Sequence, residues 1–172
     1  MSFIPVPTDN LTGAEQSIEW EHSRIHDGKG FTNSNRFTLN NNVTAYHIFR
    51  NPIGNYPHIR TLLVTATGAP IEISIHEAPT VTSGGTLTTS ANNNRNSANT
   101  PALQLYQGST VSAEGTFLAF DMLTGSKTSG GMGSENAQRE WNVAPGTDML
   151  LKVVNVGAGN VVYGLKVFWY ES

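Results

Sequence analysis

The amino-acid sequence predicts an all-β protein, an antiparallel β-sandwich of the jelly-roll type with an extended N-terminal arm. Three observations support this. Apolar residues recur at every second position in short runs, turn-forming residues fill the gaps between the runs, and no stretch has the pattern of a long amphipathic helix. About eight such runs fit two packed antiparallel sheets.

The last quarter of the chain carries the clearest pattern. Every second residue from Val161 to Trp169 is apolar, which predicts a strand with one face on a core. A second apolar run occupies 149–154, and the linker 156–160 contains two glycines. We therefore expect an antiparallel hairpin here, with Trp169 anchoring the core.

The other strands are expected in order after residue 31. Alternating or β-branched runs predict strands at 36–39, 43–49, 58–67, 71–75, 103–106, 111–113 and 116–120. Two long gaps separate them, a polar insertion at 79–101 and a glycine-rich loop at 125–136. Gaps this long are uncommon in compact domains and are often functional.

Residues 1–30 differ from the rest of the chain. Pro5 and Pro7 favour an extended backbone, and 17–27 gathers charged groups around Trp20, as a short helix or an edge strand. A turn is expected at 27–30. We therefore expect 1–30 to be an arm that docks on another subunit or a larger surface, and 31–172 to be the sandwich domain.

Composition excludes several classes of protein. The net charge is −3, the pI is about 5.9 and charged residues make up 13% of the chain, which argues against a nucleic-acid binder. There is no cysteine, and we find no secretory signal and no apolar run long enough to span a membrane. We expect a protein made in the cytoplasm, with a polar, weakly charged surface suited to packing against neighbours.

No pattern predicts a catalytic, cofactor or metal site. His22 and His26 have the spacing at which two imidazoles on one helical face can bind zinc, but Ser23 stands where zinc proteases carry a glutamate. The carboxylates are scattered, and no Gly-x-Ser-x-Gly motif is present. We expect the two histidines to form interface contacts, and the protein not to be an enzyme.

The asparagine-rich run 92–99 has two interpretations. Its amides could bind neighbouring backbone or sugar hydroxyls, or the run could be a solvated loop in which asparagine tolerates left-handed turns. Arg95 is the only charged residue between Ala78 and Ala113. Its position favours an ordered contact, such as one between subunits.

Three segments resemble parts of one group of proteins. The sequence EHSRIHDG at 21–28, with Phe31 close behind, resembles an N-terminal pattern of tailed-phage virion proteins encoded near head genes. The run NNNRNS at 92–97 and the ending FWYE at 168–171 resemble further stretches of the same group, in the same order. With the spacing between them, these segments cover nearly the whole chain.

The resemblance implies a capsid decoration, or cement, protein. Such proteins are typically β-sandwich trimers at threefold positions on the outside of the head, where they clamp neighbouring major capsid subunits. It implies the major capsid protein and further copies of this chain as partners, and the virion as the location. The expected interface residues are Trp20, Glu21, His22, Arg24, His26, Asp27, Asn93, Asn94, Arg95 and Asn96, with Trp20 and Arg24 as energetic centres.

Two other functions remain open from the sequence. One is a carbohydrate-binding module of a phage tail or head fibre, in which the asparagine-rich loop and Trp141 form a sugar platform. The other is an esterase or glycosidase on a jelly-roll scaffold.

Overall fold

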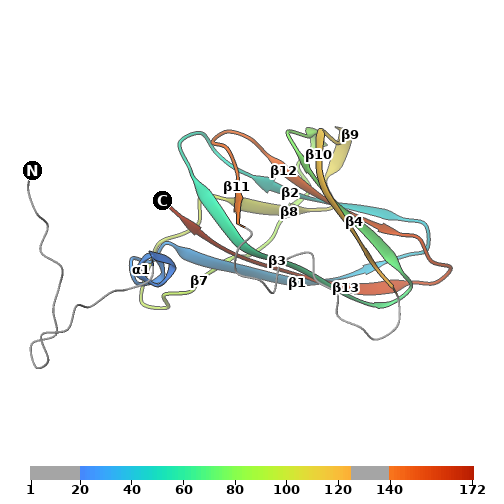
Figure 1. Cartoon of the computed structure of the whole chain (residues 1–172), viewed down its shortest axis with the longest axis horizontal. Helices are drawn as coiled ribbons and strands as arrows, with labels where there is room; N and C mark the ends of the chain where they lie inside the picture. The colour runs from blue at the N-terminus through green and yellow to red at the C-terminus, as the bar shows by residue number, and fades with distance from the viewer. Residues whose placement is uncertain (1–19, 125–139) are drawn as a thin grey trace, which may run out of the picture.

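The computed structural model describes residues 20–124 and 140–172, which form one short helix and thirteen strands (Figure 1). The elements are α1 (Trp20–His26), β1 (Gly30–Leu39), β2 (Thr44–Arg50), β3 (Pro57–Gly68), β4 (Ile71–Glu77), β5 (Thr80–Ser83), β6 (Thr86–Leu87), β7 (Ala91–Asn92), β8 (Gln104–Gln107), β9 (Thr110–Ala113), β10 (Thr116–Leu123), β11 (Trp141–Asn142), β12 (Met149–Asn155) and β13 (Val161–Glu171).

Two antiparallel sheets make up the body of the molecule. One has five strands in the order β11-β3-β13-β1-β7, and the other has six in the order β10-β4-β12-β2-β8-β6. A small third sheet pairs β5 with β9. The prediction of an all-β antiparallel sandwich is confirmed, and the strand arrangement is consistent with a jelly roll.

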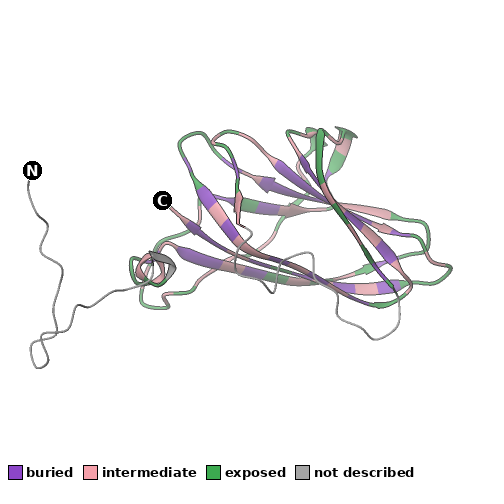
Figure 2. Cartoon of the chain, in the orientation of Figure 1, coloured by how far each residue is buried: buried purple, intermediate pink, exposed green. Residues whose placement is uncertain are grey.

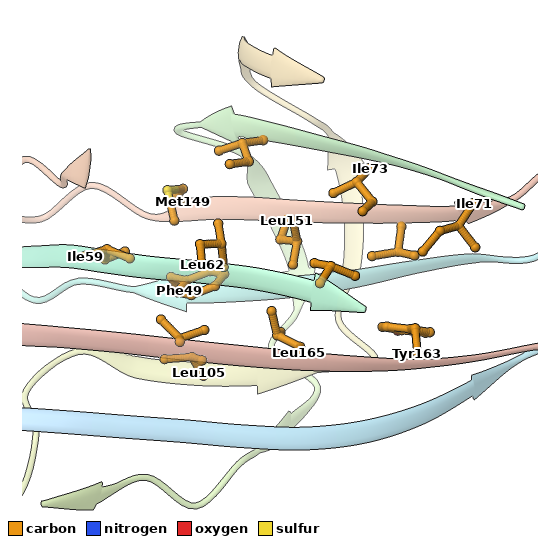
Figure 3. Close-up of a cluster of buried hydrophobic side chains, with 14 of the residues drawn as sticks. Phe49, Ile59, Leu62, Ile71, Ile73, Leu105, Met149, Leu151, Tyr163 and Leu165 are labelled. Carbon is orange, nitrogen blue, oxygen red and sulfur yellow. The ribbon is translucent and has the colours of Figure 1, made fainter. Parts of the chain in front are cut away.

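The core lies between the two sheets. Buried residues recur along the strands of both sheets in Figure 2, and Figure 3 shows side chains such as Leu62, Leu165, Phe49 and Leu151 between them. Trp169 is fully buried, as expected. The period-two pattern of the sequence therefore marks the inner faces of the strands correctly.

The predicted C-terminal hairpin is wrong. β12 and β13 both exist, but β12 belongs to the six-stranded sheet and β13 to the five-stranded sheet. The reason is that β12 pairs with β4 on one side and with β2 on the other, so both of its edges are occupied and neither is open to β13. The linker therefore crosses from one sheet to the other.

Two other connections, β1 to β2 and β3 to β4, cross between the sheets in the same way. Asn155 holds two of the crossings together, because its amide nitrogen donates to the carbonyls of Leu39 (3.2 Å), Asn40 (3.0 Å) and Gly159 (2.8 Å). The amide of Val156 donates to the carbonyl of Pro70 at 3.1 Å and joins the third crossing. One buried side chain thus organises this end of the sandwich.

The insertion at 79–101 is more structured than the sequence predicts. It contains β5, β6 and β7, and it passes from β8 of one sheet to β1 of the other. Asn33, inside β1, donates to Thr88 Oγ1 at 3.0 Å and to the carbonyl of Thr89 at 2.9 Å. Because this inward-facing residue is polar, the alternation missed the first half of β1, which begins at residue 30 and not at 36.

The predicted boundary between the arm and the sandwich domain can be compared with the structure only in part. Residues 1–19 of the predicted arm and the predicted loop at 125–136 lie outside the described residues. From Trp20 to His26 the chain is helical, one of the two forms expected for this segment, and β1 begins at Gly30.

Candidate interaction surface

Helix α1 lies against the ends of β1 and β13 (Figure 1). A β-carbon on Gly30 would be 2.8 Å from Cγ1 of Ile25, so the glycine at the start of β1 allows the helix to approach. A helix of seven residues is marginal in isolation, and its stability must therefore come from the contacts around it.

The C-terminus of α1 ends in a Schellman motif. The amide of Lys29 donates to the carbonyl of Arg24 at 2.8 Å, and that of Gly28 to the carbonyl of Ile25 at 3.0 Å. Gly28 has a φ of +70°, the left-handed conformation that this motif requires. The glycine after the helix therefore has a structural role.

The asparagine-rich loop binds the carbonyl groups at this helix end. The side-chain amide of Asn94 donates to the carbonyl of His26 at 2.8 Å, and that of Asn92 to the carbonyl of Gly28 at 2.8 Å. Asn99 donates to the carbonyls of Asp27 (3.4 Å) and Gly28 (3.3 Å). Helix C-termini leave carbonyls without intrahelical partners, and these amides satisfy them.

The loop is also ordered within itself. Backbone amides donate to the side-chain oxygens two residues before them: Asn94 to Asn92 at 2.9 Å, Asn96 to Asn94 at 3.1 Å, and Asn99 to Ser97 at 3.1 Å. An ordered contact was one of the two interpretations of this run, and the structure places that contact within the chain.

The C-terminus reaches the same end of the sandwich. The Glu171 carboxylate accepts hydrogen bonds from the backbone amides of Ala102 (3.0 Å) and Leu103 (2.8 Å), and from the indole of Trp169 at 3.1 Å. The backbone amide of Glu171 donates to the carbonyl of Lys29 at 3.0 Å. The three segments with resemblance to virion proteins therefore meet in one place, which we call the α1 end.

The expected interface residues whose side chains the structure describes divide into an exposed and a half-buried group. The exposed ones are His22, His26, Asp27, Asn93, Arg95 and Asn96. Arg24 and Asn94 are half-buried; Arg24 lies 3.9 Å from the carboxylate of Asp27, and Asn94 binds the helix end. Trp20 and Glu21 belong to α1, but their side chains lie outside the described part of the chain.

His22 and His26 face each other on α1. Their Nε2 atoms are 2.7 Å apart and their ring centroids 4.6 Å apart. In the part of the chain that the structure describes, no group of three or more His, Cys, Asp or Glu side chains is arranged to hold a metal ion.

The sequence did not single out the loop 51–57, which also lies at the α1 end. The amide of Ser172 donates to the carbonyl of Tyr56 at 3.3 Å, and Asn51 donates to the carbonyls of Val143 (3.3 Å) and Ala144 (2.8 Å). The loop is thus held in place, yet Ile53 is 92% exposed and Tyr56 55% exposed. The sequence signal that could have identified this loop as a surface is an isoleucine next to a glycine in an otherwise polar turn.

A second polar cluster lies beside the α1 end, on the outer face of the five-stranded sheet. Glu140 binds His58, Arg60 (3.0 Å) and the Tyr170 hydroxyl (3.2 Å), and the His58 and Tyr170 rings stack 4.7 Å apart. Burial raises the pKa of Glu140, but hydrogen bonds from His58 and Arg60 outweigh it, so the pKa lies below its ordinary value. The Glu140 carboxylate is therefore ionised, and it binds the three side chains together on this face of the sheet.

The sugar platform expected from Trp141 and the asparagine-rich loop is not assembled. Trp141 lies in β11 and packs against the core, whereas Asn92 lies in β7, at the opposite edge of the same sheet. Strands β3, β13 and β1 separate them, which corresponds to about 19 Å.

Comparisons with known proteins do not assign a family. No protein-family model and no curated protein matches the chain. A solved structure described as the structure of infectious bursal disease virus Gt strain is similar over 98% of this chain, at 13% identity and a TM-score of 0.18. The match spans 44% of that chain, and a score this low supports no argument about fold or function. Within the described residues, no helix has the length and hydropathy to cross a membrane.

Proposed function

We propose that this chain is a decoration protein of a tailed-phage head, which binds the outside of the capsid and stabilises contacts between major capsid subunits. One observation carries the proposal. The three segments that resemble phage virion proteins, far apart in the sequence, converge at the α1 end. Their joint resemblance then corresponds to one surface instead of three unrelated stretches.

The chemistry of this surface fits a protein partner. It combines the polar and charged groups of His22, Asp27 and Arg95 with the apolar side chain of Ile53 and the ring of Tyr56. Arginine and tyrosine are among the residue types that contribute most to interface energy. Modest contacts of this kind become strong when a symmetric shell repeats them.

The internal hydrogen bonds add a second argument. The loop 92–99 and the turn after α1 hold each other through Asn92, Asn94 and Asn99, so the exposed Asn93, Arg95 and Asn96 are presented on a fixed backbone. Binding then costs little loop ordering, and more of the contact energy appears as affinity. In this arrangement Asn92, Asn94 and Asn99 support the surface through their hydrogen bonds, and Asn93, Arg95 and Asn96 are presented to the partner.

The proposal includes partners and a location. The partners are the major capsid protein and further copies of this chain, in a homotrimer, and the protein occupies the exterior of the virion after synthesis in the host cytoplasm. It requires no cofactor, no metal and no catalysis.

The test is binding to heads of the phage whose genome encodes this chain. Heads that lack the protein are mixed with wild-type chain or with the Arg95→Ala/Asn96→Ala variant, and bound protein is measured by co-sedimentation. Electron microscopy locates the wild-type protein on the head. We expect binding by the wild type, and at least 10-fold weaker binding by the variant.

Lys166→Ala is the matched control. Lys166 is an exposed cation on β13, four residues or about 13 Å along the strand from Tyr170, and it lies away from the α1 end. It should bind as the wild type does. Absence of the wild-type protein from heads would contradict the function, and undiminished binding of the Arg95 variant would contradict the surface.

A further inference from the structure

Strand β10 exposes four large apolar side chains at one edge of the six-stranded sheet. Phe117 is 59% exposed, Leu118 39%, Phe120 54% and Met122 47%. We call these four residues the β10 strip. Since large side chains each carry about 150–250 Å², the strip leaves about 400 Å² of apolar surface in water. That is the size of the largest patch on a typical monomer, and such patches are often functional.

A β-bulge places the strip on the outer face. Phe117 pairs with His76 and Ala119 pairs with Ile75, so Leu118 is an extra residue in the strand. After the bulge, Phe120 and Met122 share the outer face with Phe117, although plain alternation would put Phe117 on the opposite face from them. Ala119 and Leu123 face the core side instead. Because Phe117, Phe120 and Met122 point outward, their side chains do not contribute to the core.

The edge of β10 carries one feature that protects edge strands, the bulge at Leu118, but few protecting side chains. β10 pairs with β4 on one side and is the last strand of its sheet. Between Thr116 and Leu123 there is no lysine, arginine or proline. The one charged residue, Asp121, is half-buried, and its carboxylate accepts a hydrogen bond from the backbone amide of Met122 at 2.8 Å.

The charges beside the strip cancel in part within the chain. His76 stacks edge-on against Phe117 and lies 3.7 Å from Glu114, which in turn binds Lys152 at 2.7 Å and the Tyr46 hydroxyl at 3.3 Å. The hydrogen bond from Lys152 holds the pKa of Glu114 below its ordinary value, so the carboxylate is ionised and paired. Glu114 and Lys152 therefore neutralise each other, and Glu72, which pairs with Met122 in the strand register, is a remaining charge at the rim of the strip.

We propose that copies of this chain associate through the β10 strip, with the strip of each copy packed against the strips of neighbouring copies at the symmetry axis of the oligomer. The inference takes from the proposed function only that copies of the chain associate. Contact between two strips removes about 800 Å² of apolar surface, and with a polar rim it reaches the roughly 1,200 Å² of a specific interface. The side chains of the strip itself are uncharged, so a second copy presents a matching apolar surface, whereas a strongly charged partner would gain nothing from it.

Site-specific cross-linking tests the proposal directly. Because the chain has no cysteine, Phe120→Cys introduces a single thiol. Under mild oxidation we expect a disulfide between two copies. Leu87→Cys is the control, since Leu87 is 53% exposed on β6, at the opposite edge of the same sheet. It should give at least 10-fold less cross-linked product.

The mass of the protein in solution gives a second measurement. The wild type should be oligomeric by light scattering, Phe117→Ser/Phe120→Ser should raise the dissociation constant of self-association more than 100-fold, and Leu87→Ser should leave it unchanged. Both replacements are at exposed positions, and circular dichroism checks that the variants fold.

Two results would overturn the proposal. One is a wild-type protein that stays monomeric at about 100 μM, which is far above the dissociation constant of a specific complex. This holds whether the strip is then open to thiol reagents or covered by another part of the chain. The other is a serine variant with the wild-type mass. The capsid proposal is tested separately. The Arg95→Ala/Asn96→Ala variant should bind heads more weakly while its oligomeric mass stays that of the wild type.

Discussion

Gly28 and Ser97 lie so close together that a β-carbon on Gly28 would be 2.2 Å from Oγ of Ser97 and 2.6 Å from its Cβ. Gly28 ends helix α1, and Ser97 belongs to the asparagine-rich loop. Each residue constrains the other: the helix end needs a residue without a side chain, and the loop fills the space left by it.

Replacing Gly28 should therefore destabilise the protein. Gly28→Ala adds backbone strain at a φ of +70° and a clash with Ser97. We expect the free energy of unfolding to fall by about 2–4 kcal/mol, measured by urea titration.

Gly54→Ala separates the two causes. Gly54 has a φ of +85°, but nothing lies within 4 Å of a β-carbon there, so only strain of about 1 kcal/mol is expected. Ser97→Gly removes the contact but also the hydrogen bond from the Asn99 amide, so the Ser97→Gly protein is the reference: in that background Gly28→Ala should cost only the strain of about 1 kcal/mol. Equal costs at Gly28 and Gly54 would show that the contact with Ser97 contributes nothing.

The asparagine-rich loop should control the exchange of amide hydrogens in α1. Asn94→Ala removes the hydrogen bond to the carbonyl of His26 and the one that its side chain accepts from the amide of Asn96. Amide hydrogens of 23–29 should then exchange about 10-fold faster with deuterium, because the helix loses part of its support. Asn93→Ala, one residue away at an exposed position, should leave the exchange unchanged. Equal rates in the two variants would contradict the role of Asn94.

The strands and the core could be predicted from the sequence, because burial imposes an alternation that is visible without the fold. Trp169 and the strand around it are examples. The pairing of strands could not be predicted, since a linker such as 156–160 suits a hairpin and a crossing between sheets equally well. Only the occupied edges of β12 decide between them.

Two parts of the candidate surface could be singled out in the sequence, but the surface itself could not. The α1 segment and the asparagine-rich loop were both identified, yet their contact depends on the pairing of β7 with β1 at Phe31 and Asn92. Local patterns carry no information about such a distant pair. The outward position of Phe120 was likewise hidden, because it depends on a bulge at Leu118.

Asn155 should be essential to the stability of the end of the sandwich at which the chain crosses between the two sheets. It is fully buried, donates to three carbonyls, and accepts a hydrogen bond from the amide of Gly157 at 3.0 Å. Asn155→Asp keeps the shape but cannot donate, so it leaves three carbonyls, from two chain crossings, facing a carboxylate. We expect a loss of about 3 kcal/mol in the free energy of unfolding at neutral pH.

Asn160→Asp is the control for this substitution. Asn160 is exposed in the same linker, and the change should alter stability by less than about 0.5 kcal/mol. If both variants unfold at the same urea concentration, the buried hydrogen bonds of Asn155 do not hold the crossings.

The stability of the protein should fall in mild acid because of His47. This residue lies in the core, with Nε2 2.8 Å from the hydroxyl of Tyr163 and its ring 4.7 Å from that of Phe37. Burial lowers the pKa of His47 to about 4, against 6.5 in an unfolded chain. Between these two values the unfolded state binds the proton and the folded state does not.

The sign follows from that difference in proton binding. The contribution of His47 is fully present above pH 6.5, declines as the pH falls, and is lost once the pH passes the folded pKa of about 4. At about pH 4.5 the free energy of unfolding should be about 2–3 kcal/mol lower than at pH 7 from this residue alone. Urea titrations at both pH values measure the change.

Two variants test whether the buried imidazole causes this dependence. His47→Gln does not titrate, so its stability should change between pH 7 and 4.5 by about 2–3 kcal/mol less than that of the wild type. Tyr163→Phe keeps the imidazole buried, so it should be less stable at both pH values but retain the wild-type slope. A His47→Gln variant with the full acid sensitivity would mean that the imidazole enters the core already charged, or that it is hydrated there.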